Sequence, residues 1–489
     1  MPMPPSEDAQ TRYAAALRLM QAGRMAEART ALTALLASHP DSPEIRAQLA
    51  RIAHEEGDFA TRADHLDRAL AARPGMPALL DAAVAAFADA GRVEDALAAH
   101  DARIAAARKP LHAAADKGIY LQRIGRFDEA EALFRELIAR APFEGVLYRT
   151  FLATHRLAAD DPLMGRLRKA ANNPKVGDET RVHALFALAK ALEDQGAHDE
   201  VFPVLHRANR LQRRLAPYDR AAREAEDAAI RAAQDRAALD PIDLEAALAP
   251  VFVTGMPRSG TTLAEQIVGA HPDATAGGEL ALALRLAHAR FAANGRLAAL
   301  RSLKDPDLAR YAASYLHGVR RATGARRGTV TDKSIQSHLV YGYLARALPG
   351  ARFVVIDRDP RDVALSIYKT HFALGTHRYA NDLADIAAAI KAFRASVAAW
   401  QDRLGDRLVR VAYEDLVGDP EPAARRLVAA AGLDWDPACL TFHERGGAVR
   451  TLSIAQVRQP IHGGRRAAWR RYETEMQPFI DAWGDDPWD

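Results

Sequence analysis

The sequence lacks three features that each define a whole class of protein. It has one cysteine, Cys439, in 489 residues, so no disulfide can close within the chain and no cysteine cluster can hold a metal. No stretch reaches the roughly 18 uncharged apolar residues that a membrane-spanning helix needs. The chain also does not open on a basic segment followed by an apolar one. We therefore expect a cytoplasmic protein in a reducing compartment.

Neither sign of charge dominates. The chain has 66 Lys+Arg and 63 Asp+Glu, a formal net charge of +3, with 49% hydrophobic residues. This is the composition of an ordinary globular protein, and at ~150 residues per domain the length suggests about three folding units. Local basic clusters, such as Arg320 and Arg321, are more typical of solvated faces or small-anion sites than of nucleic-acid interfaces. We expect no nucleic-acid or membrane partner.

A repeat with a period of 34 residues runs through the first third of the chain. It is marked by Gly23, Gly57, Gly91 and Gly125, with prolines 17 residues after three of these glycines, at Pro40, Pro74 and Pro142. A glycine that turns the chain between two helices and a proline that ends the second helix predict a helix-turn-helix unit. The pattern resembles tetratricopeptide repeats. Such repeats stack into an all-α solenoid that binds peptides or packs on its own catalytic domain.

The pattern changes after about residue 250. The β-branched and aromatic run 251–254 is followed by Gly255-Met-Pro-Arg-Ser-Gly-Thr-Thr-Leu and then by an amphipathic segment. This predicts a strand, a phosphate-binding loop with the G-x4-G spacing, and a helix. Thr261 stands where a nucleoside triphosphatase has lysine, and Arg258 supplies a cation instead. The loop therefore favours a donor that has no γ-phosphate.

A second strand-turn-helix follows at residues 352–368. It places Arg358 at the end of a strand and Ser366 on the next helix. Arginine donates two parallel hydrogen bonds to a phosphate, and serine adds a neutral donor. The pair predicts a second phosphate contact.

These motifs resemble sulfotransferases that use 3′-phosphoadenosine 5′-phosphosulfate (PAPS), in particular bacterial members with N-terminal tetratricopeptide repeats and the tyrosylprotein sulfotransferases. The resemblance implies an α/β domain of the P-loop type with a mostly parallel sheet. It implies PAPS as co-substrate, with no metal. The implied donor contacts are Arg258, Ser259, Gly260, Thr261 and Thr262 for the 5′-phosphosulfate, Arg358 and Ser366 for the 3′-phosphate, and Tyr413, Gln456, Val457 and Arg458 around them.

The resemblance also implies three catalytic residues. Glu279 lies where the tyrosylprotein enzymes place the base that takes the proton of the acceptor hydroxyl. Lys333 lies where their lysine contacts the sulfuryl group and the leaving phosphate oxygen, and Ser453 assists by hydrogen bonding. Simpler interpretations are that Glu279 is a surface carboxylate at a helix start, that Lys333 pairs with Asp332 or another carboxylate, and that Tyr413 only packs in the core.

Two positions depart from the tyrosylprotein pattern. Ala281 replaces an arginine two residues after the glutamate, and Ala468 replaces a basic residue before Trp469. The acceptor, which is a peptide tyrosine, a sugar or a small molecule, can therefore be recognised differently. Arg458, Arg465, Arg466 or Arg470 could replace the missing cation.

We expect a tetratricopeptide-like domain at 10–215, a helical connector at 216–248 and a sulfotransferase domain at 249–489. The predicted reaction is transfer of a sulfuryl group from PAPS to an acceptor hydroxyl, with the acceptor, a protein or a small molecule, recruited by the repeats. One alternative is a P-loop kinase, which the missing lysine disfavours. Another is a scaffold without catalytic activity that carries a degenerate nucleotide domain.

Overall fold

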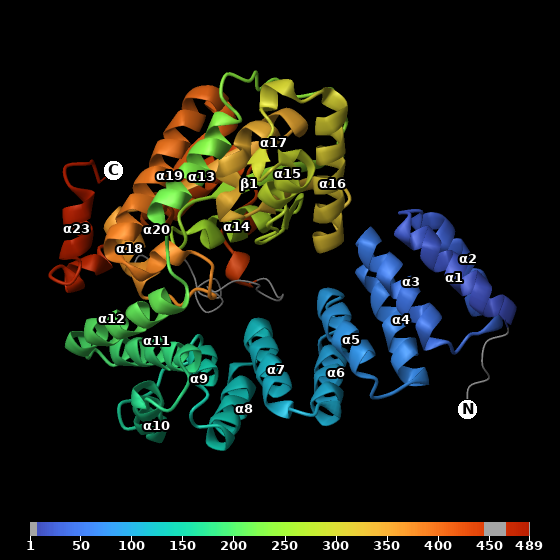
Figure 1. Ribbon diagram of the computed structural model, residues 1–489, viewed down its shortest axis with the longest axis horizontal. Helices are drawn as coiled ribbons and strands as arrows, with labels where there is room; N and C mark the ends of the chain where they lie inside the picture. Colours follow the sequence, from blue (N-terminus) through green and yellow to red (C-terminus); the bar gives the residue numbers. More distant parts are fainter. Residues whose placement is uncertain (1–6, 445–465, 489) are drawn as a thin grey trace. The chain divides into compact units, whose positions relative to one another are not determined.

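A computed structural model describes residues 7–444 and 466–488 of the chain (Figure 1). The first half consists of consecutive antiparallel helices, and an α/β domain with a parallel sheet follows it. The helices of the first half are α1(Glu7–Gln21), α2(Met25–Ser38), α3(Pro43–Glu56), α4(Phe59–Ala72), α5(Pro77–Asp89), α6(Val93–Ala106), α7(Pro110–Ile124), α8(Phe127–Arg140), α9(Gly145–Phe151), α10(Pro162–Asn172), α11(Asp178–Asp194), α12(His198–Leu215) and α13(Arg220–Ala232).

The 34-residue period corresponds to the turns inside successive helical pairs. Gly23, Gly57, Gly91 and Gly125 have φ of +76°, +69°, +71° and +85°, a left-handed conformation that glycine adopts without the steric cost of a Cβ. The turns at Gly23, Gly57 and Gly91 let the second helix fold back on the first, and small alanines such as Ala28 and Ala96 are fully buried where the two helices of a pair meet. The predicted helical repeat is confirmed.

The second half contains a five-stranded parallel sheet in the order β2-β5-β1-β6-β7. Its strands are β1(Leu248–Thr254), β2(Ala274–Ala276), β5(Gly328–Asp332), β6(Arg352–Asp357) and β7(Leu408–Ala412). Because β1 is the central strand, the loop between its carboxyl end and the next helix lies at the middle of the sheet edge. In open parallel sheets ligands bind at that edge. The predicted α/β domain with a parallel sheet is confirmed.

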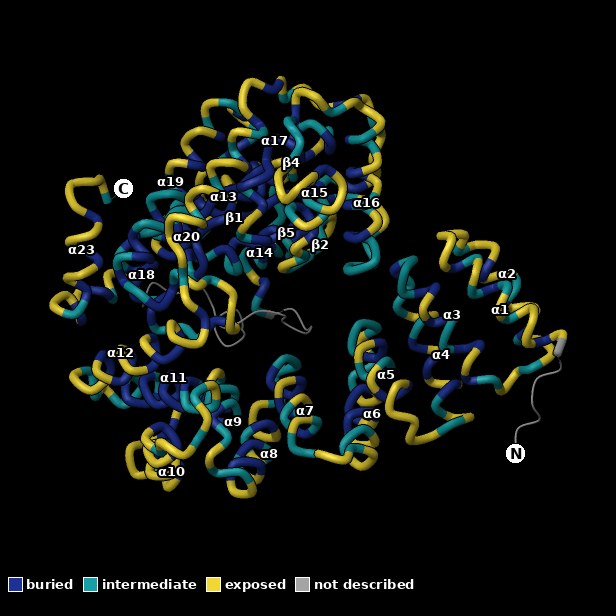
Figure 2. Tube along the Cα trace, in the orientation of Figure 1, coloured by how far each residue is buried: buried dark blue, intermediate teal, exposed yellow. Residues whose placement is uncertain are grey.

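Alternate residues of β1 face opposite layers of helices. Val251 and Val253 pack in one core with residues of α14(Thr261–Gly269), α20(Tyr413–Gly418) and α21(Pro420–Ala430). Phe252 faces the other side, where its ring lies 5.5 Å from Tyr315 of α16(Asp305–Thr323). A strand covered on both faces reads as a continuous apolar run, and nearly all of β1 is buried (Figure 2).

The remaining elements connect these layers. They are α15(Ala283–Phe291), the short hairpin β3(Ala292–Ala293) and β4(Arg296–Leu297), α17(Tyr341–Ala347), α18(Pro360–Tyr368), α19(Leu383–Leu404), α23(Gln477–Trp483), and the 3-10 turns η1(Leu300–Ser302), η2(Ile335–Val340), η3(Arg378–Asn381), η4(Gly405–Arg407), η5(Pro437–Cys439), η6(Phe442–Glu444) and η7(Ala468–Tyr472).

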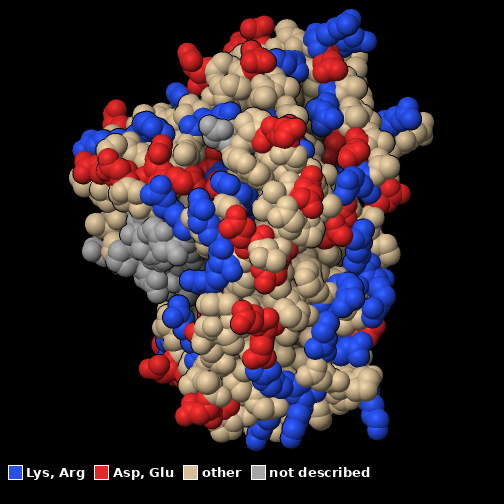
Figure 3. All heavy atoms as spheres, turned by 90° about the vertical axis from the view of Figure 1, so that its left-hand side faces the viewer, with Lys and Arg blue, Asp and Glu red and all other residues tan. Residues whose placement is uncertain are grey.

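The chain divides into two compact units. One comprises residues 1–124 with 320–324, and the other comprises 125–319 with 325–489. Helices α8 to α13 therefore group with the sheet, whereas the sequence placed 10–215, 216–248 and 249–489 apart; that division into three domains stays a prediction. No helix in 7–444 or 466–488 is long and apolar enough to span a membrane. Basic and acidic side chains both occur on the face drawn in Figure 3, as the near-zero balance of charge leads one to expect.

Candidate functional site

The candidate residues within the described part of the chain follow the carboxyl ends of the five parallel strands. The predicted phosphate-binding loop follows β1, Glu279 follows β2, Lys333 follows β5, Arg358 follows β6 and Tyr413 follows β7. Arg258 and Tyr413, which are 155 positions apart in the sequence, thus share one edge of the sheet. This is the edge at which such sheets bind ligands.

The loop after β1 offers polar groups to an anion. Gly260 has a φ of +107° and caps α14, so Thr261 and Thr262 form the first turn of that helix, where backbone N–H groups are free of helical partners. The Ser259 side chain is 1% exposed, and its Oγ has no hydrogen-bond partner among the described residues. A buried hydroxyl without a partner is unfavourable, so the loop fits a ligand that carries oxygen acceptors.

Tyr413 fills the space above Gly260. A Cβ at position 260 would lie 2.4 Å from the Tyr413 ring, so only glycine fits this close approach. The Arg358 guanidinium lies 4.4 Å from the centre of the same ring, in a cation–π contact that orients the guanidinium. Tyr413 also belongs to the core beside α14. Tyr413 therefore packs in the core and also contacts the loop, and its predicted contact with the donor stays a prediction.

Arg258, Ser366 and Arg358 are brought together. Arg258 Nε donates to Ser366 Oγ at 3.3 Å, and Arg358 Nη1 donates to the Arg258 carbonyl at 3.0 Å. Arg258 has a φ of +71°, a strained conformation that non-glycine residues keep only where their surroundings enforce it. The cations of the first loop and of the second motif thus meet at one place, which suits a ligand with more than one anionic group.

Lys333 and Glu279 form an ion pair. Lys333 Nζ lies 2.7 Å from Glu279 Oε1; the lysine side chain is 2% exposed and the glutamate side chain is 59% exposed. The partner of Lys333 is thus Glu279 and not the adjacent Asp332, which accepts hydrogen bonds from Tyr315 and Ser334. The arrangement holds the lysine amino group inside the protein and the glutamate carboxylate at the surface. Such a pair can serve a proton transfer and the charge that develops with it.

Four predicted residues, Ser453, Gln456, Val457 and Arg458, lie outside the described residues. The chain after them is held beside the second motif, because Asp362 of α18 accepts the backbone N–H groups of Ala467 and Trp469 at 2.8 and 3.0 Å. Asp362 also lies 3.8 Å from Arg358 Nη2. Ala468 itself begins η7.

A cavity of about 90 Å³ adjoins the loop after β1 and the turn after Lys333. Its walls include Met256, Ile335, Tyr218, His377 and Tyr379. Burial lowers the pKa of His377, and the charge of Glu279 raises it. His377 therefore lies within electrostatic reach of Glu279. Tyr218 and Tyr379 could not be predicted as site residues, because they come from separate segments without a shared motif.

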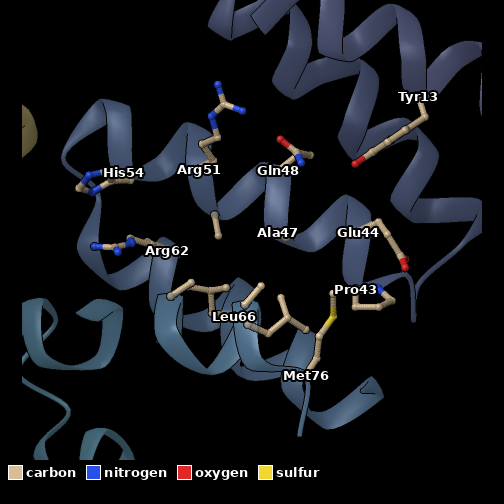
Figure 4. Close-up of a pocket in the computed structure, with 14 residues that line it drawn as sticks. Tyr13, Pro43, Glu44, Ala47, Gln48, Arg51, His54, Arg62, Leu66 and Met76 are labelled. Carbon is tan, nitrogen blue, oxygen red and sulfur yellow. The ribbon is translucent and has the colours of Figure 1, made fainter. Parts of the chain in front are cut away.

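A larger cavity, of about 400 Å³, lies within the repeats (Figure 4). Side chains of α1, α3, α4 and the start of α5 line it, including Tyr13, Gln48 and Arg51. Gln48 Oε1 and His54 Nδ1 are buried without a hydrogen-bond partner in the described chain. These atoms can bond to a polar group that enters the cavity.

Comparison with known families finds one match in each half of the chain. Residues 250–437 match the model of the sulfotransferase family, and residues 13–77 match that of the tetratricopeptide repeat. The chain carries a sulfotransferase-family domain behind tetratricopeptide repeats. The loop after β1, Glu279, Lys333, Arg358, Ser366 and Tyr413 all lie in the sulfotransferase segment. Tyr218 lies before it.

Two relatives and one solved structure illustrate the similarity. An uncharacterized protein of Aquifex aeolicus is 29% identical over 378 residues, which are 74% of this chain and 48% of that protein. A putative protein-tyrosine sulfotransferase of Caenorhabditis briggsae is 22% identical over 249 residues, 48% of this chain and 89% of that protein. The match to the Aquifex protein thus spans about half of its length.

The sulfotransferase domain of the Synechococcus PCC 7002 olefin synthase is 20% identical and superposes with a TM-score of 0.35, covering 51% of this chain and 98% of that domain. A score of this size carries no argument about function.

Proposed function

We propose that this protein transfers a sulfuryl group from PAPS to the hydroxyl of an acceptor. The observation that carries the proposal is the meeting, at one sheet edge, of a phosphate-binding loop without the lysine of nucleoside triphosphatases and the Lys333–Glu279 ion pair. The first suits a donor with no γ-phosphate. The ion pair supplies a base for the acceptor hydroxyl and a cation for the leaving group, which the transfer of a sulfuryl group requires.

The residues of the loop and of the second motif hold the donor. The unpartnered Ser259 hydroxyl, the first turn of α14 and the Arg258 guanidinium bind the 5′-phosphosulfate, and Arg358 with Ser366 binds the 3′-phosphate. PAPS supplies the sulfuryl group that is transferred. Ser453, Gln456, Val457 and Arg458 complete the proposed set of contacts from outside the described residues.

Glu279 and Lys333 then divide the chemistry. Glu279 takes the proton of the acceptor hydroxyl, which raises the nucleophilicity of its oxygen. Lys333 offsets the negative charge that grows on the leaving phosphate oxygen. The ion pair keeps Glu279 beside Lys333, so the base is aligned before the substrates arrive.

The cavity beside the ion pair is the proposed acceptor site. Its lining mixes apolar and aromatic side chains with a few charged ones, as small-molecule sites commonly do. A peptide tyrosine, a sugar and a small molecule each remain candidate acceptors. The cavity within the repeats is a proposed docking place for a protein acceptor, with Gln48 and His54 offering hydrogen bonds to its backbone.

Calorimetric titration with 3′-phosphoadenosine 5′-phosphate tests the donor. We expect tight binding to the wild-type protein, and binding about 10- to 100-fold weaker for Arg358→Ala, because charge-assisted hydrogen bonds to a phosphate are lost. Arg310→Ala serves as the matched control, because Arg310 is exposed and pairs with Asp307 on α16.

The same titration with ATP and Mg²⁺ separates the alternatives. Binding of ATP without binding of the bisphosphate would favour a kinase and would contradict the proposal. Binding of the bisphosphate without turnover of any acceptor would favour the scaffold.

A further inference from the structure

Glu265 is a buried carboxylate that the proposed chemistry does not use. It lies on α14, one turn after Thr261, and is 1% exposed. Its neighbours Ala264, Ile267 and Val268 pack in the apolar core, and burial raises the pKa of the Glu265 carboxyl. A leucine would fill such a position at lower desolvation cost, so the carboxylate has to be explained by what it bonds.

One oxygen of Glu265 joins the segments that carry the two proposed catalytic residues. Glu265 Oε1 accepts the backbone N–H of Gly278 at 2.8 Å and the hydroxyl of Thr331 at 3.1 Å. Gly278 directly precedes Glu279, and Thr331 stands two residues before Lys333. The helix that begins at the phosphate-binding loop therefore also fixes the turn that presents the proposed base.

The turn depends on this bond. Gly278 has a φ of +72°, and its carbonyl accepts the N–H of Lys333 at 2.9 Å. The preceding Gly277 donates its N–H to the Thr331 carbonyl at 3.1 Å. Gly278 is thus held from two sides, by Glu265 on its N–H and by Lys333 on its carbonyl. Without Glu265 the Gly278 N–H loses its acceptor, and the turn is held only by the Gly277 N–H and by the bonds of Lys333 and Leu280 to the Gly278 carbonyl. The turn is then looser, and Glu279 can move away from Lys333 Nζ.

We propose that Glu265 is a positioning residue, which holds the Gly277–Gly278 turn so that Glu279 stays aligned with Lys333. The inference rests on the proposed function for its consequence in catalysis. Because the carboxylate acts through the backbone of Gly278, an amide oxygen of the same reach can replace it. A misplacement of about 1 Å in a catalytic group costs up to about 100-fold in rate.

The test compares four variants of the full chain. Glu265→Ala removes the acceptor, Glu265→Asp keeps the charge but shortens the reach, and Glu265→Gln keeps the reach without the charge. Asp161→Ala is the matched control, because Asp161 also accepts a backbone N–H, from Leu163, and a side-chain bond, from Arg135, but it caps α10.

We expect kcat to fall about 10- to 100-fold in the Ala and Asp variants, with the acceptor KM and the affinity for 3′-phosphoadenosine 5′-phosphate within threefold of wild type. The Gln variant should recover kcat to within about fivefold. Amide hydrogen exchange at 277–279 should accelerate in the Ala and Asp variants and return in the Gln variant. Asp161→Ala should change neither measurement.

Wild-type kcat and exchange in the Ala and Asp variants would overturn the inference. So would a Gln variant as slow as the Ala variant, or a parallel loss of kcat and bisphosphate affinity, which would indicate general disruption of the domain. If Glu265→Ala does not fold, the Asp and Gln variants decide. If the wild-type protein turns over no acceptor, the proposed function fails, but the exchange measurement still decides the role of Glu265.

Discussion

At the scale of single residues, the Lys333–Glu279 ion pair predicts how substitutions of its two members change catalysis and stability. Lys333 is 2% exposed and Glu279 is 59% exposed. We expect Glu279→Ala and Lys333→Met each to lower kcat about 100- to 10,000-fold, because one removes the base and the other removes the cation. Glu279→Ala leaves the buried Lys333 charge without its ion-pair partner, and Lys333→Met removes the cation that lowers the pKa of the buried Glu265 carboxyl. Both substitutions should therefore lower the Tm.

Steady-state kinetics and thermal unfolding check both parts of this prediction. Glu245→Ala and Lys304→Ala are the controls, since both residues are exposed and lie outside the sheet edge. Wild-type kcat in either substituted pair member would contradict its catalytic role. A wild-type Tm in Glu279→Ala would contradict the account of the buried Lys333 charge.

The sequence predicted residues better than it predicted their contacts. Gly260 and Arg358 could be read from local motifs, because a glycine at G-x4-G spacing and an arginine at a strand end have known uses. The contact of Tyr413 with both of them could not be read, since the three residues follow different strands. Glu265 left a weaker signal, which was a single carboxylate within an otherwise apolar helical face.

At the scale of elements, the parallel sheet explains why the site residues are far apart in the sequence. Each βα unit returns the next strand in the same direction, so its carboxyl end contributes one loop to the same edge. The sequence predicted the strands that precede Arg258 and Arg358. The three-residue strand β2 before Glu279 is too short to give a periodic signal, and its pairing with β5 places it.

Helix α11 meets the segment after α18 through two histidines. The rings of His183 and His371 lie 4.3 Å apart, and Arg149 donates to His183 Nδ1 at 3.0 Å. Burial, with the charge of Arg149, lowers the pKa of His183 to about 4 and that of His371 to about 3. Both rings are therefore neutral in the folded protein at neutral pH, with a cation beside them.

This arrangement predicts that stability falls in mild acid. An unfolded histidine takes up a proton below a pH of about 6.5, whereas the folded rings resist protonation until about pH 4 and pH 3. Between these limits the unfolded chain binds more protons, so the free energy of unfolding decreases as the pH falls. His371→Asn should make this decrease shallower. Urea unfolding at pH 7, 6 and 5 measures how the free energy of unfolding changes with pH. His112→Asn is the control, because His112 is exposed. If the free energy of unfolding depends on pH in His371→Asn as it does in the wild type, His371 is not one of the groups responsible.

At the scale of the whole molecule, helices α11 to α13 are built into the sulfotransferase half. Asn209 and Gln212 of α12 are buried and donate to the carbonyls of Tyr368 and Phe372 at 3.0 and 2.8 Å. Arg220 at the start of α13 donates to Asp385 of α19 at 2.9 Å. Gln234, just after α13, is fully buried and bonds the backbone of Leu339 and Gly342. These contacts stabilise the segment that carries His377 and Tyr379.

Two truncations should therefore behave differently. A fragment of residues 125–489 keeps all of these contacts, and we expect it to bind 3′-phosphoadenosine 5′-phosphate within about threefold of the full chain. A fragment of residues 241–489 lacks α11 to α13, so it leaves the carbonyls of Tyr368 and Phe372 without their donors and exposes the apolar surface under α12. Unpaired buried polar groups and exposed apolar area both disfavour folding, so this fragment should aggregate or bind at least tenfold more weakly.

Circular dichroism and calorimetry of the two fragments decide the point. If residues 241–489 fold and bind as well as the full chain, α11 to α13 belong to the repeats alone, and the acceptor cavity does not depend on them.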